Sequence, residues 1–112
     1  MQDPRLGLRQ RLVDAVLDTA GASDPALRRA VQARAAQLGG SAVAGAADVA
    51  ADLSRYIDKV AMHAYKTTDE DVAALLHAGY SEDAVFEITV SAALGAGMAR
   101  LERGLAALER AG

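Results

Sequence analysis

The 112-residue chain contains no cysteine. Without thiols it can form neither a disulfide framework nor a thiolate metal site, and it has no thiolate nucleophile of its own. The absence fits a reducing compartment, and residues 1–11 lack the long apolar run that a secretory signal needs. We therefore expect a cytoplasmic protein.

Aromatic residues and long uncharged segments are also scarce. Four residues are aromatic, whereas 27 are alanine and the apolar fraction is 52%. The apolar charge-free stretch from Ile88 to Ala99 has 12 residues, and a membrane span needs roughly 20. We expect no membrane association, but a single domain whose small-residue helices pack closely and whose core is completed by self-association.

The charges are nearly balanced but unevenly distributed. The formal net charge is −3, from 12 basic and 15 acidic residues. Residues 1–56 carry seven basic and six acidic side chains, a balance of +1, whereas residues 57–112 carry five basic and nine acidic side chains, a balance of −4. Because proteins that bind DNA or RNA concentrate lysine and arginine on one face, we expect no nucleic-acid partner.

Five helices are predicted from apolar spacing and from end signals. Two Asp-Pro pairs, at 3–4 and 24–25, place a capping carboxylate before a first-turn proline. Thr68 and Ser81 are hydroxyl caps followed by acidic residues. No alternating pattern typical of a strand is present. The predicted helices cover 3–21, 24–40, Ala46 or Asp48 to about Ala64, 68–79, and 81 to near the end, with residues 39–45 as a flexible connection.

The last helix is predicted to be long and buried on nearly all sides. Large apolar residues recur along it at steps of three or four: Phe86, Val90, Leu94, Met98, Leu101, Leu105 and Leu108. A second apolar row is Val85, Ile88, Ala92, Ala96 and Ala99. The triplet Gly95-Ala96-Gly97 would let another helix approach closely. These patterns predict an all-α, single-domain bundle of about five helices, in which a contact between subunits covers the second face of the long helix.

The segment from Tyr65 to Leu108 reads YKTTDEDVAALLHAGYSEDAVFEITVSAALGAGMARLERGLAAL. Its TDEDVAAL helix start, AGYSED turn, FEI opening and small-residue middle resemble the C-terminal part of the carboxymuconolactone decarboxylase and alkylhydroperoxidase D-like superfamily. The resemblance implies a small helical fold that assembles into a homo-oligomer, either a trimer or a hexamer.

The redox members of that superfamily carry a Cys-x-x-Cys-x-x-x-His motif. The best match to its spacing here is Tyr56-x-x-Lys59-x-x-x-His63, which retains the histidine alone. Because a disulfide-forming peroxidase needs a thiolate, thiol-dependent peroxidase activity is predicted to be absent. The lactone decarboxylase branch implies acid–base chemistry without a metal or cofactor, and His63 is the candidate for it on motif grounds.

Four residues of the third helix form the predicted site. Asp52, Tyr56, Lys59 and His63 share a polar stripe about a quarter-turn from the apolar face. In a functional interpretation His63 is the acid or base, Lys59 holds an anion, Tyr56 donates a hydrogen bond and Asp52 orients its neighbours. In a structural interpretation the stripe is the border of an amphipathic helix, and its long side chains reach water.

Other kinds of site are disfavoured. Residues 68–79 and the helix from Ser81 have the layout of a helix-turn-helix, but residues 68–87 hold six acidic residues and no lysine or arginine. The two histidines are 14 positions apart, and His77 suits the C-terminal end of its helix, so we expect neither metal nor cofactor. Two hypotheses stay open: a cofactor-free enzyme acting on a small anionic carbonyl or lactone compound, and a non-catalytic oligomeric or ligand-binding protein.

Overall fold

The computed structural model describes residues 4–40 and 49–111. Within those ranges the chain forms helices and no strand, which confirms the predicted all-α class. The elements are α1 (Pro4–Asp18), α2 (Pro25–Leu38), α3 (Ala51–His63), the short 3-10 helix η1 (Ala64–Lys66), α4 (Asp69–His77) and α5 (Glu82–Ala111).

The predicted end signals act where they are described. The Asp24 carboxylate accepts a hydrogen bond from the Ala26 backbone N–H at 2.9 Å, so it caps α2 as expected. The predicted start of the third helix is wrong, because Ala50 is extended (φ −57°, ψ 149°) and α3 begins only at Ala51. The predicted cap Asp3 and the predicted starts Ala46 and Asp48 lie outside the described residues.

A tight turn joins α4 to α5. Gly79 has a φ of 107°, a left-handed conformation that glycine adopts without a steric penalty. The Tyr80 N–H reaches back to the Leu75 carbonyl at 3.2 Å, which closes the end of α4. Ser81 then accepts a hydrogen bond from the Ala84 N–H at 3.1 Å, so α5 begins where the hydroxyl cap predicts.

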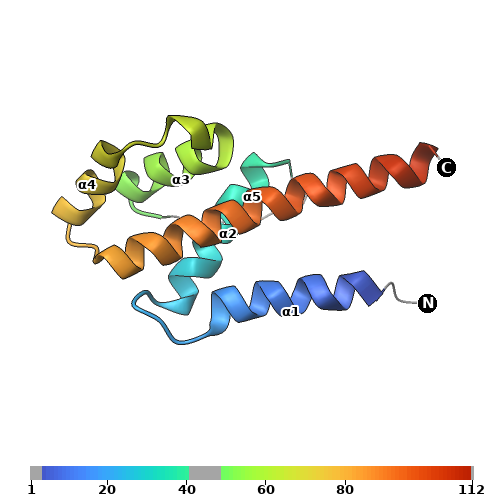
Figure 1. Cartoon of the computed structure of the whole chain (residues 1–112), viewed down its shortest axis with the longest axis horizontal. Coiled ribbons are helices and arrows are strands. Elements are labelled where there is room, and N and C mark those ends of the chain that lie inside the picture. Colours follow the sequence, from blue (N-terminus) through green and yellow to red (C-terminus); the bar gives the residue numbers. More distant parts are fainter. Residues whose placement is uncertain (1–3, 41–48, 112) are drawn as a thin grey trace.

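Helix α5 runs the length of the molecule and organises the other helices (Figure 1). In this view α3 and α4 lie on one side of α5, α1 lies on the other, and α2 crosses between them. The start of α1 and the end of α5 lie at the same end of the molecule. The α2–α5 contact is the most extensive between any two elements of the described chain.

Small residues bring α2 and α5 together. Gly95 of α5 is buried, and a Cβ atom there would overlap the Gln32 carbonyl oxygen of α2. At the C-terminal cap of α2, a Cβ on Gly39 would lie 2.9 Å from the Ala96 carbonyl oxygen. The predicted role of the glycine triplet in close helix packing is therefore confirmed at Gly95, whereas nothing lies within 4 Å of a Cβ built on Gly97.

The two apolar rows of α5 have different surroundings. The row of mainly smaller residues is buried against the other helices: Val85, Ile88, Ala92, Ala96 and Ala99. In the row of larger residues, Phe86, Leu101 and Leu108 are exposed, so α5 is not buried on nearly all sides within a single chain. By length and composition α5 could cross a membrane, but 44% of its most apolar window is buried inside this fold.

The α1–α2 loop is fixed to α5 by the Glu87 carboxylate. This carboxylate accepts hydrogen bonds from the N–H groups of Ala22 and Ser23, both at 2.8 Å, and from the Ser23 hydroxyl. Buried Arg28 lies beside this carboxylate and donates hydrogen bonds to the carbonyl oxygens of Val16, at 2.7 Å, and Thr19. These two bonds satisfy carbonyl groups at the C-terminal end of α1. Helix α1 therefore ends at Asp18 and not at the predicted Gly21. Chiefly through the Ser23 hydroxyl, these donors hold the pKa of Glu87 below its ordinary value.

Replacing Gly95 by alanine should destabilise the fold by about 1–3 kcal/mol, because the added methyl group meets α2 backbone atoms that cannot rotate away. Gly97→Ala is the matched control on the same helix. Its free energy of unfolding should rise by about 0.5–1 kcal/mol, because alanine reduces the backbone entropy of the unfolded chain. Urea unfolding followed by circular dichroism at one protein concentration measures both. Equal stability of the two variants would contradict the close α2–α5 contact.

The Glu87 contacts should make stability depend on pH in a defined direction. Since folding lowers the pKa of Glu87 from 4.5, its contribution is complete above about pH 4.5 and disappears as the pH falls through the lower folded-state value. Wild type should therefore be more stable than Glu87→Gln at pH 7, and the difference should shrink below pH 4.5. A difference that stays constant from pH 7 to pH 3 would show that ionisation of Glu87 contributes nothing.

Candidate functional site

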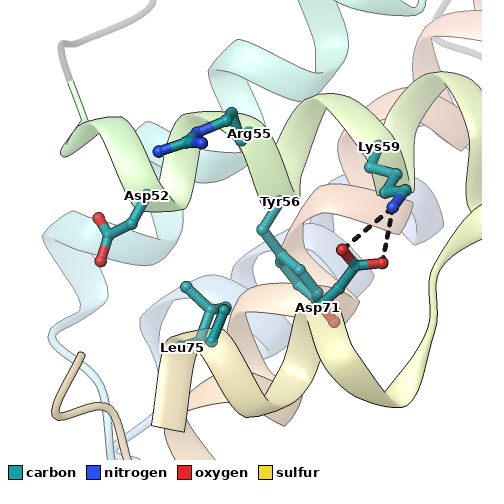
Figure 2. A pocket seen from close by; sticks show the side chains of 7 residues that line it. Asp52, Arg55, Tyr56, Lys59, Asp71 and Leu75 are labelled. Atoms are coloured by element: carbon teal, nitrogen blue, oxygen red, sulfur yellow. Dashed lines mark hydrogen bonds and ion pairs between the residues drawn. The ribbon is translucent and has the colours of Figure 1, made fainter. Parts of the chain in front are cut away.

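Three of the four predicted site residues line one pocket between α3 and α4. The pocket has a volume of about 380 Å³, and Asp52, Tyr56 and Lys59 face it from α3. These residues lie four and three positions apart, so a single side of α3 presents them all. The remaining lining residues, which the sequence analysis did not single out, are Arg55, Asp71, Ala74 and Leu75 (Figure 2).

Tyr56 belongs to the core and not to a polar border. Its side chain is 5% exposed and packs in the main hydrophobic cluster. Its hydroxyl lies 2.6 Å from the Thr89 hydroxyl of α5, which donates its own proton to the Val85 carbonyl at 2.7 Å. The Tyr56 hydroxyl is therefore the donor to Thr89, and the phenol ring forms the apolar wall of the pocket. The prediction that Tyr56 belongs to a polar stripe outside the core is therefore wrong.

Lys59 is held by an acidic partner from α4. Its ammonium nitrogen lies 3.0 and 2.8 Å from the two Asp71 carboxylate oxygens (Figure 2). Asp71 also accepts a hydrogen bond from the Thr68 N–H at 2.8 Å, in the first turn of α4. First the Lys59 ammonium and then the Thr68 N–H hold the pKa of Asp71 below its usual range. The pair as a whole carries no net charge, and the Lys59 ammonium already has an anionic partner.

The other end of the pocket carries one carboxylate and one guanidinium. The Asp52 carboxylate accepts a hydrogen bond from the Leu53 N–H at 2.9 Å, near the N-terminal end of α3. Burial and then the negative charge of Asp52 raise the pKa of the Tyr80 hydroxyl. Arg55 is exposed and makes no hydrogen bond or ion pair with any described residue. It is the lining cation that stays free for an anionic group.

His63 lies apart from this pocket. It is the last residue of α3, with φ −144° and ψ 52°, and the chain turns into η1 directly after it. Its ring is exposed and contacts the Tyr65 ring edge-on, at 6.1 Å between centroids. Helical spacing placed His63 on the stripe with Lys59, but the break after α3 leaves it outside the residues that line the pocket.

The pocket supplies binding groups rather than a prepared acid or base. Its wall is the Tyr56 ring and Leu75, and its charged groups are Asp52, Arg55 and the Lys59–Asp71 ion pair. Such a surface can hold the apolar part of a small molecule and pair with its negative charge. In residues 4–40 and 49–111, no three histidine, aspartate or glutamate side chains lie close enough to hold a metal ion.

Asp71 should contribute more to the stability of α4 than its acidic neighbours do. Asp71→Asn removes a charge partner of Lys59 and weakens the bond to Thr68, whereas Asp69→Asn removes a charge at the same helix end without a partner in the described chain. Thermal unfolding should therefore show a larger drop in midpoint for Asp71→Asn. A drop no larger than that of Asp69→Asn would contradict the role of the Lys59–Asp71 pair.

In comparisons with known proteins, no family model, curated protein or solved structure matches this chain. The resemblance to the carboxymuconolactone decarboxylase and alkylhydroperoxidase D-like superfamily thus rests on the motifs of the segment from Tyr65 to Leu108 alone.

Proposed function

We propose that this chain is a small-molecule binding protein whose α3–α4 pocket holds a compact ligand with one negatively charged group. The observation that carries the proposal is the free Arg55 guanidinium at the rim of a pocket whose other cation, Lys59, is neutralised by Asp71. The ligand's charge pairs with Arg55, and its apolar part packs on Tyr56 and Leu75.

The contacts of the predicted site residues favour binding over acid–base catalysis. A general acid or base must reach the reacting group and exchange a proton with it. The Tyr56 hydroxyl donates to Thr89, Lys59 is paired, and His63 is exposed outside the pocket. The cofactor-free enzyme on a carbonyl or lactone compound therefore stays a prediction of the family resemblance, with no pocket geometry in its favour.

We retain the proposed family membership in a limited form. The chain is a cysteine-less relative of the carboxymuconolactone decarboxylase and alkylhydroperoxidase D-like proteins, with Tyr56 and Lys59 at the positions of the two thiols. Both residues have structural partners here, one in the core and one in an ion pair. Under this proposal, the chain keeps the helical scaffold of the family and lacks thiol-dependent peroxidase chemistry.

Self-association in the cytoplasm completes the proposal. The exposed large residues of α5 form an apolar row that a second subunit would cover. The family resemblance suggests a trimer or a hexamer.

A panel of small carboxylates tests the binding proposal. Ligand-observed NMR with the full chain should detect at least one binder, and Arg55→Gln should weaken its affinity about tenfold or more, since a charged hydrogen bond contributes about 1.5–3 kcal/mol. Arg110→Gln, an exposed arginine at the end of α5, is the matched control and should bind as wild type does.

Two results would contradict the proposal in different ways. Unchanged affinity in Arg55→Gln would place the anionic group elsewhere. Loss of binding in His63→Gln, which should bind normally, would instead favour the acid–base hypothesis.

A further inference from the structure

The pocket between α3 and α4 presents one unpaired charge of each sign. Its four charged lining residues are Asp52, Arg55, Lys59 and Asp71. Lys59 and Asp71 pair with each other, at 3.0 and 2.8 Å, which leaves Asp52 and Arg55 without a charged partner in the described chain. Figure 2 shows these two residues on one side of Tyr56 and the Lys59–Asp71 pair on the other. The two unpaired charges therefore lie in the same part of the pocket.

The negative charge of Asp52 is not balanced by the protein. The side chain is half-buried, and among the described residues its one hydrogen bond comes from the Leu53 N–H to Oδ1, at 2.9 Å. The ion pairs that α3 forms in the described chain use Asp58 and Lys59 instead. The charge also acts on the Tyr80 hydroxyl, whose pKa is raised first by burial and then by Asp52. Asp52 thus keeps an oxygen atom and a full charge for a cationic group.

The spacing of Asp52 and Arg55 restricts how far apart the charges of a ligand can be. The two residues are three positions apart on α3, and side chains at this spacing are neighbours on a helix, with Cβ atoms about 5–6 Å apart. A ligand that pairs with both must therefore carry its own two charges close together. In an α-amino acid the ammonium and the carboxylate share one carbon atom, which meets this requirement.

A ligand with a single charge fits this arrangement less well. A simple carboxylate that pairs with Arg55 brings its negative charge close to Asp52, and a simple amine that pairs with Asp52 brings its positive charge close to Arg55. Like charges that are only partly screened by water oppose binding. A zwitterion avoids both repulsions, because each of its charges meets the opposite one.

The rest of the pocket is suited to an apolar side chain of modest size. Tyr56 and Leu75 are core residues that form its wall, and Ala74 adjoins them. The volume of about 380 Å³ is near the lower end of the range of roughly 300–1,000 Å³ that is common for small-molecule sites. The space therefore favours a single amino acid over a longer peptide.

We propose that the ligand of the α3–α4 pocket is a free α-amino acid with an apolar side chain. Its ammonium pairs with the Asp52 carboxylate, and its carboxylate pairs with the Arg55 guanidinium, which can donate two parallel hydrogen bonds to it. The apolar side chain packs on Tyr56 and Leu75. This inference rests on the proposed binding function and narrows its ligand from carboxylates in general to zwitterions.

Ligand-observed NMR titrations of the full chain test the inference with three probes, L-valine, L-leucine and L-phenylalanine. Each is compared with its N-acetyl form, which lacks the ammonium, and with its amide, which lacks the carboxylate. At least one free amino acid should bind at least tenfold more tightly than either of its derivatives, because only the free form satisfies both Asp52 and Arg55.

The variant Asp52→Asn separates recognition of the ammonium from recognition of the carboxylate. It should weaken binding of the free amino acid at least tenfold. It should bind the N-acetyl form at least as tightly as wild type does, since a negative charge beside the ligand's carboxylate has been removed. Glu109→Gln removes an exposed carboxylate near the end of α5, and this matched control should bind the amino acid as wild type does. Circular dichroism checks that both variants keep the wild-type helix content.

Three outcomes would overturn the inference, and they differ in what they say of the proposed function. If the N-acetyl forms bind as tightly as the free amino acids and lose affinity in Arg55→Gln, the pocket binds carboxylates and only the zwitterion is refuted. Unchanged affinity of Asp52→Asn for the free amino acid refutes the role of Asp52 alone. If neither the amino acids nor the simple carboxylates bind, the inference and the proposed function fail together.

Discussion

The close approach of α2 and α5 is the constraint on which the other contacts depend. At Gly95 the backbone of α2 occupies the space that a side chain would need, so the inner face of α5 can carry only small residues near this contact. Ala92, Ala96 and Ala99 accordingly lie on that face. The alanine-rich composition is therefore a packing requirement, because contact area here comes from backbone proximity and not from bulky side chains.

The same constraint determines where the large apolar residues of α5 lie. A helix that presents its small residues inward turns its large residues outward, and Phe86, Leu101 and Leu108 are the result. One face of α5 thus completes the core of the chain, and the other face is exposed. Glu87 lies beside this boundary and fixes the α1–α2 loop to α5.

The α3–α4 pocket lies on the opposite side of α5 from α1 (Figure 1). Its wall is anchored to α5 through Tyr56 and Thr89, and its rim is fixed to α4 through Lys59 and Asp71. Tyr56 thus lies in the core, and Lys59 forms an ion pair between α3 and α4.

The sequence by itself determined the helices, several of their ends and the absence of thiol chemistry, because caps, turns and residue chemistry are local properties. Asp24, Ser81 and the glycine turn at Gly79 act as their neighbours in the chain predict. Tertiary structure alone decided which row of α5 is inside, that Tyr56 is buried, that Lys59 meets Asp71 and that His63 lies outside the pocket. These outcomes depend on how closely α2 approaches α5 and on where α3 stops, and both are set by contacts between residues far apart in the chain.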